Sequence, residues 1–124
     1  MIIFREYDEG MNLFCIEMSG RIQLYEIMEF LDKILSDNSL PRQLRIIEDA
    51  TSADFCFDIE DSWYVRELLE IQSKKFLSLR YAMLRETPMQ TAYAMMLDYE
   101  NNIKNCHTKV FFTKHGALQW LLCV

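Results

Sequence analysis

The chain has 124 residues, the size of one domain, and its 51% hydrophobic content suffices for a core without metal or disulfide staples. Its formal net charge of −6 argues against nucleic-acid binding, which needs a basic surface. The start lacks the features of a signal peptide, and the longest apolar stretch, 117–124, is too short to span a bilayer. We therefore expect one cytoplasmic domain over residues 1–124, without a transmembrane segment.

The four cysteines form no C-x-x-C pair and are expected to be buried, reduced thiols. They are Cys15, Cys56, Cys106 and Cys123.

The first half of the chain predicts a hairpin, a helix and a central strand. Two apolar-rich runs, 2–7 and 12–18, are separated by a break that contains Gly10, which is typical of a β-hairpin. Ser19-Gly20-Arg21 is expected to open a helix whose apolar positions from Leu24 to Leu35 recur at helical spacing. Residues 44–49 form a short apolar run that ends on Glu48 and Asp49 and is followed by polar residues 50–54. This pattern predicts a strand covered on both faces, followed by a loop.

The second half predicts three more helices that alternate with two strands. One helix begins around residues 58–61 and ends near 74–75, and strands cover residues 79–84 and 109–113. Thr87-Pro88-Met89-Gln90 matches a capping box with proline at the first helical position. We expect Met89, Ala92, Tyr93 and Met96 to form the buried stripe of that helix, which runs out over 101–105. A short terminal helix packs inward through Leu118, Leu121 and Leu122, with Trp120 near the edge.

The order of the elements predicts an α/β fold. It consists of a mostly parallel five-stranded sheet, with an antiparallel first strand at or near an edge, and four helices.

Three features of the sequence resemble the SpoIIAA-like superfamily, which includes STAS domains and relatives compared with CRAL-TRIO domains. They are the order of elements, Gly20 ahead of the strand that ends on acids, and the segment 109–121. That segment is similar to the F-x-T-x-x-x-A-x-x-W-L ending of small bacterial members, here Phe111, Thr113, Ala117, Trp120 and Leu121. The resemblance implies a SpoIIAA-like β/α superhelix and a non-enzymatic protein-interaction or regulatory module, acting on a protein partner or by self-association.

One motif of that superfamily is incomplete in this sequence. Anti-sigma-factor antagonists carry a phosphorylated serine in an Asp-Ser-[Ser/Thr]-Gly-Leu-type motif, and the nearest match is Asp61-Ser62-Trp63-Tyr64. Because the glycine and leucine are missing, Ser62 as a phosphosite competes with the plainer interpretation of a helix cap.

The candidate site is the carboxyl edge of the sheet, where parallel α/β proteins commonly bind ligands. Polar residues expected at this edge could form a binding rim, or they could be ordinary caps and solvated loop residues, which is the favoured interpretation. They are Asp49, Thr51, Ser52, Arg85, Thr87, Lys114 and His115.

No catalytic, cofactor or metal motif is present in the sequence. The three glycines are isolated, so no phosphate loop exists, and Cys106 and His107 would point to opposite faces of a strand. Asp49 with His115 is a distant acid–base alternative.

Two groups of apolar residues allow further hypotheses about ligands and partners. The methionine-rich set could line a pocket for an apolar small molecule or lipid, although such residues more often fill a core. The aromatic set, if exposed together, would mark a partner surface or a lid. The sets are Met83, Met89, Met95 and Met96, and Phe55, Phe57, Trp63 and Tyr64.

Overall fold

A single mixed sheet forms the frame of the protein. The computed structural model describes residues 1–98 and 103–122. The five strands follow one another in space in chain order, and only the edge strand β1 runs antiparallel to its neighbour. The strands are β1 (Ile2–Asp8), β2 (Leu13–Ile22), β3 (Gln43–Phe55), β4 (Ser78–Leu84) and β5 (Cys106–Phe111). The predicted α/β class and the position of the antiparallel strand are confirmed.

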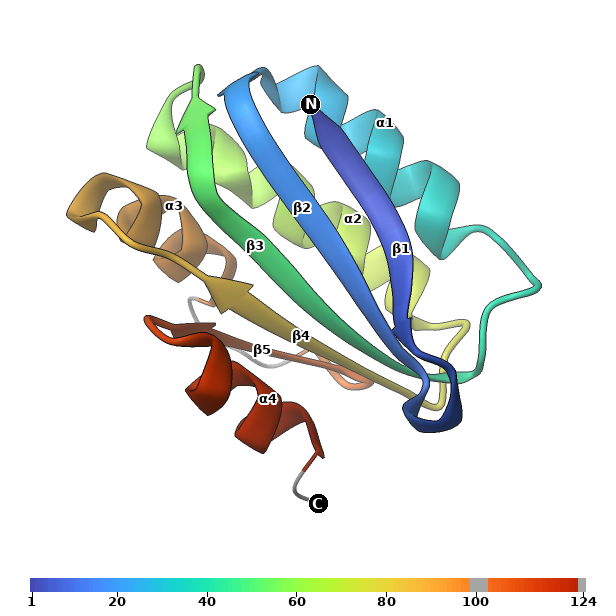
Figure 1. Ribbon diagram of the computed structural model, residues 1–124. Helices are drawn as coiled ribbons and strands as arrows, with labels where there is room; N and C mark the ends of the chain where they lie inside the picture. The colour runs from blue at the N-terminus through green and yellow to red at the C-terminus, as the bar shows by residue number, and fades with distance from the viewer. Residues whose placement is uncertain (99–102, 123–124) are drawn as a thin grey trace.

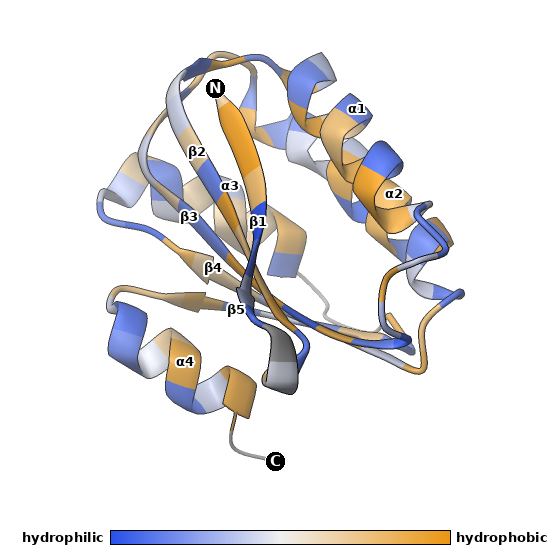
Figure 2. Ribbon diagram, turned by 45° about the vertical axis from the view of Figure 1, so that its right-hand side comes forward, coloured by the Kyte–Doolittle hydropathy of each residue, from blue (hydrophilic) through white to orange (hydrophobic). Residues whose placement is uncertain are grey.

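Helices cover the two faces of the sheet unequally. Figures 1 and 2 show α1 (Leu24–Leu35), α2 (Ser62–Ser73) and α3 (Pro88–Asp98) on one face and α4 (Lys114–Leu122) alone on the other. Single turns of 3₁₀ helix, η1 (Glu9–Met11) and η2 (Ile59–Asp61), precede β2 and α2. None of the helices that the structure describes is both long and apolar enough to cross a membrane.

The central strand β3 contributes to a core on each side of the sheet. Ile46 packs into the large core under α1, α2 and α3, and Ile47 packs into the smaller core under α4. Successive residues of a strand face opposite sides of the sheet. Because a helix layer covers each side, both side chains are almost completely buried. The prediction that residues 44–49 form a central strand covered on both faces is confirmed.

The helix opening predicted at Ser19-Gly20-Arg21 is wrong. These residues extend β2, where Ser19, Gly20 and Arg21 pair with Ser52, Ala53 and Asp54 of β3. Gly20 has φ 73°, a backbone conformation that other residues rarely adopt, and it takes this conformation inside the strand. The helix begins at Leu24, and the Glu26 carboxylate accepts a hydrogen bond from the Gln23 amide at 3.2 Å.

The loop predicted over residues 50–54 is also wrong, because β3 continues to Phe55. The polar composition suggested a loop, but the extended end of β2 supplies a hydrogen-bonding neighbour for this segment. Tertiary pairing therefore overrides the local composition.

The last strand and the buried face of α3 are shifted from their predicted positions. β5 spans Cys106–Phe111 rather than 109–113, because Cys106 and Thr108 face the core whereas Phe112 is 69% exposed. On α3, Met89 is exposed and Met96 only partly buried, and the buried residues are Gln90, Tyr93, Ala94 and Leu97. The predicted end of this helix, 101–105, lies partly outside the described residues.

Candidate functional site

A buried ion pair joins the middle of β3 to the carboxyl end of β4, beneath the three-helix layer. Arg85 donates from Nη2 to one carboxylate oxygen of Glu48, and the Tyr81 hydroxyl donates to the other. Glu48 is 3% exposed and Arg85 2%, so each charge is stable there only because it is paired. Burial, and then the neighbouring Glu48 charge, raises the pKa of Tyr81 well above its ordinary value, so its hydroxyl remains a donor. The network joins β3 to β4.

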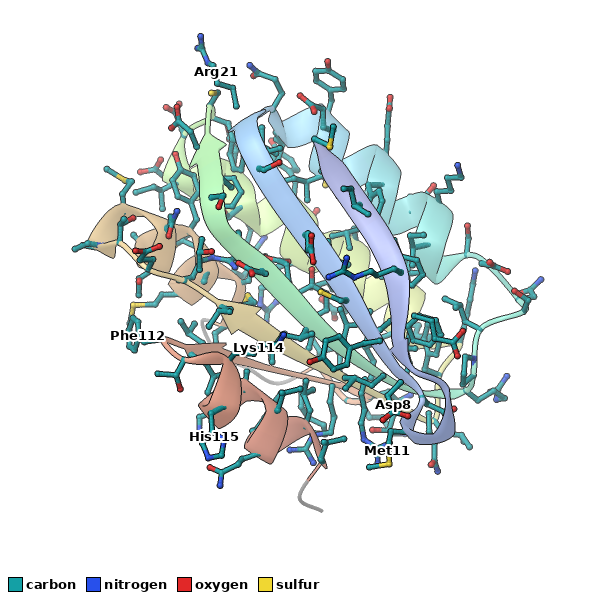
Figure 3. All side chains as sticks on the ribbon, in the orientation of Figure 1. Asp8, Met11, Arg21, Phe112, Lys114 and His115 are labelled. Atoms are coloured by element: carbon teal, nitrogen blue, oxygen red, sulfur yellow. The ribbon has the colours of Figure 1, made fainter. Side chains whose placement is uncertain are left out.

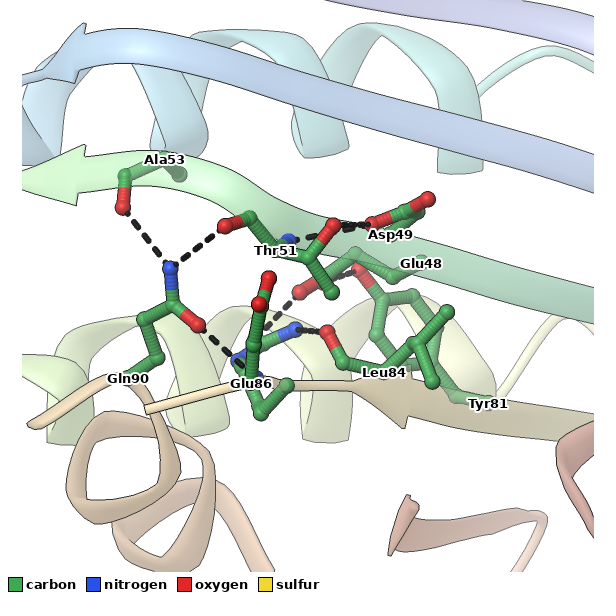
Figure 4. Close-up of polar contacts among 9 residues, drawn as sticks. Glu48, Asp49, Thr51, Ala53, Tyr81, Leu84, Glu86 and Gln90 are labelled. Carbon is green, nitrogen blue, oxygen red and sulfur yellow. Dashed lines mark hydrogen bonds and ion pairs between the residues drawn. The ribbon is translucent and has the colours of Figure 1, made fainter. Parts of the chain in front are cut away.

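Gln90 connects the network region to the extended end of β3 (Figure 4). Its side-chain oxygen accepts from the amides of Glu86 and Thr87 at 2.9 and 3.1 Å, and Thr87 Oγ1 accepts from the Gln90 amide at 3.2 Å. The predicted capping box is thus confirmed. In addition, Gln90 Nε2 donates to the carbonyls of Thr51 and Ala53 at 2.9 and 3.1 Å. The described pairing of β4 with β3 ends at Asp49, so the Gln90 amide occupies the place of a strand neighbour beyond it.

A β-bulge in β3 follows Asp49. Glu17 pairs with Asp49 but Ser19 pairs with Ser52, so β3 has one residue more than β2 over this interval. The Asp49 carboxylate accepts hydrogen bonds from the amide and hydroxyl of Thr51 at 3.0 and 2.7 Å. Together with Ile3, Glu17 and other residues, Asp49 and Ser52 line a shallow hollow of about 100 Å³.

An aromatic cluster covers the three-helix side of the carboxyl edge. The rings of Phe55, Phe57 and Tyr93 lie 5.0 to 5.7 Å apart, and the Tyr93 hydroxyl donates to the Phe57 carbonyl. Burial, followed by the nearby Asp58 and Asp54, raises the pKa of Tyr93 above its ordinary value. Beneath the cluster, next to Arg85 and Ser62, lies a cavity of about 20 Å³. One water molecule needs roughly 10–15 Å³, so this cavity has no room for a lipid chain.

The outward surface of α2 exposes large apolar side chains among acids. Tyr64 is 54% exposed and Ile71 63%, whereas Trp63 is 38% exposed and its ring lies 4.8 Å from the Arg66 guanidinium. The surrounding exposed acids are Asp58, Glu60, Glu67 and Glu70.

The comparisons with known proteins define the fold. No family model matches the chain, and no curated protein matches it. Among solved structures, an uncharacterised protein of the DUF3478 family with a SpoIIAA-like fold, from Shewanella loihica PV-4, superposes with a TM-score of 0.59. The alignment covers 98% of this chain and 92% of that one, at 18% identity.

The chain has a SpoIIAA-like fold. At this identity the likeness extends to the fold alone. The resemblance first seen in the residues around β3 and in the C-terminal segment is confirmed at that level.

The predicted site residues lie in several separate environments. Asp49, Thr51 and Ser52 remain together on β3, but Arg85 is buried under the opposite face and Thr87 caps α3. Lys114 lies over the sheet with its Nζ 4.9 Å from the centre of the Tyr7 ring, and His115 projects from the other side of α4 (Figure 3). The hydrogen bond to Tyr7 raises the pKa of Lys114. These residues do not converge on one rim.

Ser62 is the first residue of α2 and is only 3% exposed. Ser62 is one of the residues that line the small cavity beneath the aromatic cluster, where a kinase has no access without local opening.

Metal-ligating side chains do not gather into one site in the part of the chain that the structure describes. Over residues 1–98 and 103–122, no group of three or more His, Cys, Asp or Glu side chains could hold a metal ion. Cys106 is buried and its pKa rises to about 12 through burial, which makes the thiol a poor nucleophile. Cys15 is likewise buried, Cys56 is half-buried, and Cys123 lies outside the described residues.

Sequence reasoning missed the roles of Tyr81, Glu48 and the second role of Gln90. Their contacts join residues 33 to 39 positions apart in the chain. The one local signal was a charged residue, Arg85, directly after a buried apolar strand.

Proposed function

We propose that this SpoIIAA-like domain is a non-enzymatic protein-interaction module, and that the outward face of α2 binds a basic, partly apolar segment of a partner protein. The supporting observation is the exposure of Tyr64 and Ile71 on one stripe of the helix. They are seven positions apart and so lie on one side of the helix, whereas Val65 and Leu69 are buried and fix α2 to the core. Because they are exposed, both side chains are presented to solvent from a helix that is fixed to the core, as an anchor for a partner requires.

The charge around this stripe selects the chemistry of the partner. Asp58, Glu60, Glu67 and Glu70 are exposed beside it, whereas Lys74 and Lys75 are exposed just past the end of the helix, and the whole chain carries a net charge of −6. A basic segment is attracted by this surface and an acidic one is repelled. An amphipathic helix that carries lysine or arginine beside an apolar stripe fits both features.

The geometry does not favour the alternative of an apolar small molecule. Ligand pockets usually enclose roughly 300–1,000 Å³, whereas the cavity between sheet and helices measures about 20 Å³. Met89 and Met95, expected to line such a pocket, are 62% and 61% exposed.

The test measures binding of a fluorescein-labelled synthetic basic amphipathic helix by fluorescence anisotropy. The double variants Asp58→Lys/Glu60→Lys and Tyr64→Ala/Ile71→Ala should each weaken binding by about tenfold or more, equivalent to roughly 1.4 kcal/mol. The control Glu6→Lys/Asp8→Lys makes the same change in net charge on the edge strand β1 and should leave the affinity within about twofold.

Two results would reject this proposal. Equal weakening by the control would mean that the peptide senses only overall charge. Self-association of the wild-type chain that is lost in Tyr64→Ala/Ile71→Ala would assign the face to a second copy of the protein instead of a basic partner.

A further inference from the structure

Basic side chains from three adjacent strands lie side by side on the α4 face of the sheet. Arg45 of β3 pairs in register with Arg80 of β4, which pairs with His107 of β5. Neighbouring strands are about 4.8 Å apart, so the three residues form a row across the sheet. Lys109 lies two residues beyond His107 and faces the same side. Arg45, Arg80 and His107 lie within the first three residues of their strands, whose amino ends are at the lower right of the sheet in Figure 1. Lys109 is the fourth of the six residues of β5.

These charges are not neutralised by carboxylates. Within residues 1–98 and 103–122, none of the four is ion-paired, whereas the salt bridges described there involve Arg5, Arg66 and Arg85. Arg45, Arg80 and Lys109 carry positive charge without an acidic partner in this part of the chain, although the chain as a whole has a net charge of −6. A bound anion would supply the opposite charge.

The two arginines are held in fixed positions. Arg45 donates from Nη1 to the Met11 carbonyl at 2.6 Å, and Arg80 donates from Nη2 to the Trp120 carbonyl at 2.6 Å. The Arg80 guanidinium also lies 4.4 Å from the centre of the Trp120 ring, and its buried Nε has no hydrogen-bond partner in the described part of the chain. Because the guanidinium groups are already ordered, a ligand loses little of its binding energy to ordering them.

Open space adjoins the row on both sides of Arg80. A hollow of about 400 Å³ is lined by Arg80, His107, Thr108, Lys109 and Trp120. A second hollow of about 240 Å³ is lined by Arg80, Arg45 and neighbouring residues of β3 and β4. Neither lining includes an acidic residue. The larger hollow can admit a small molecule as well as an anion.

We propose that Arg80, His107 and Lys109, with Arg45 beside them, form a binding site for the phosphate group of a soluble phosphate ester. Guanidinium groups match the paired oxygens of a phosphate, and lysine adds a point charge. A phosphate monoester has three terminal oxygens and close to two negative charges, so it can use more of these donors than a carboxylate can. The site lies on the opposite face of the sheet from α2 and is independent of the proposed partner surface.

The test is an NMR titration of the ¹⁵N-labelled protein with inorganic phosphate and with glycerol 3-phosphate at constant ionic strength. We expect saturable shifts of the backbone amides near Arg45, Arg80 and His107 and of the Arg80 Nε–H signal. The variant His107→Gln/Lys109→Gln changes two exposed side chains and should weaken binding about tenfold. The control Lys74→Gln/Lys75→Gln removes exposed positive charge at the end of α2 and should bind phosphate like the wild type.

Three results would overturn the proposal. One is the absence of saturable shifts with either compound, and another is equal weakening in the patch variant and the control. The third is binding only to vesicles that contain phosphatidic acid, lost in His107→Gln/Lys109→Gln, because the phosphate would then come from a lipid headgroup. Thermal melting of each variant verifies that the fold is intact.

Discussion

Glu48 and Arg85 form a buried ion pair on which the stability of the folded chain depends. Each is almost fully buried, so removal of one partner leaves the other charge without compensation. We expect Glu48→Leu and Arg85→Met each to lower the free energy of unfolding by about 3–5 kcal/mol. The double variant should lose much less than the sum, because apolar side chains then fill the site together.

Urea unfolding followed by circular dichroism measures this cycle. Tyr81→Phe is the matched control, since it removes one hydrogen bond to Glu48 and leaves the charges paired. It should lower the stability by only about 1–2 kcal/mol. Additive losses in the double variant would show that the two charges do not depend on each other.

The Gln90 side chain makes two sets of hydrogen bonds, one through its oxygen and one through its nitrogen, and the isosteric change to Glu removes only the second. Gln90→Glu keeps the oxygen that accepts from Glu86 and Thr87, but it replaces the donor to Thr51 and Ala53 with a charged acceptor. Two strand carbonyls would then face a carboxylate. We expect a loss of about 2–4 kcal/mol at neutral pH, measured by urea unfolding.

Thr87→Ala is the comparison for this prediction, because it removes only the helix cap, and about 1 kcal/mol should be lost. Hydrogen exchange at residues 51–55 should accelerate in Gln90→Glu and not in Thr87→Ala. Unchanged exchange in both variants would mean that the end of β3 does not need Gln90.

At the scale of elements, local patterns predicted which elements exist better than where they end. The apolar run of β3 was visible because both faces bury it, and the Thr87–Gln90 cap because its partners are three residues apart. The extension of β2 and β3 was not visible, because Ser19–Ile22 and Ser52–Phe55 are polar or mixed and are strands only through each other. Pairing between distant segments leaves no signature in either one alone.

The contacts within the candidate site could not be predicted from the sequence for the same reason. Asp49 and Thr51 lie together because they are near neighbours on one strand, which the sequence alone shows. Arg85 was placed at that rim as well, although its side chain turns under the other face to reach Glu48. The row of basic residues is likewise built from three strands, and only the register brings them together.

The whole molecule has two cores of different size, which predicts unequal dependence on its two faces. The large core joins α1, α2 and α3 to the sheet, whereas the core under α4 contains Leu13, Cys15, Ile47, Ala82, Ala117 and Leu121. An isolated helix as short as α4, nine residues, is unstable in water, so α4 depends on this contact. Ile47→Asp places an unpaired charge there, and α4 should undock while the three-helix face remains folded.

Fluorescence distinguishes the two faces, because Trp120 lies on α4 and Trp63 on α2. In a Trp63→Phe background, Ile47→Asp should shift the emission of Trp120 to the red at urea concentrations where far-ultraviolet circular dichroism still reports a folded sheet. Ile46→Asp disrupts the large core, so it should remove both signals together. If the two signals also coincide in Ile47→Asp, α4 and the three-helix face form one cooperative unit, and the smaller core is as essential as the larger.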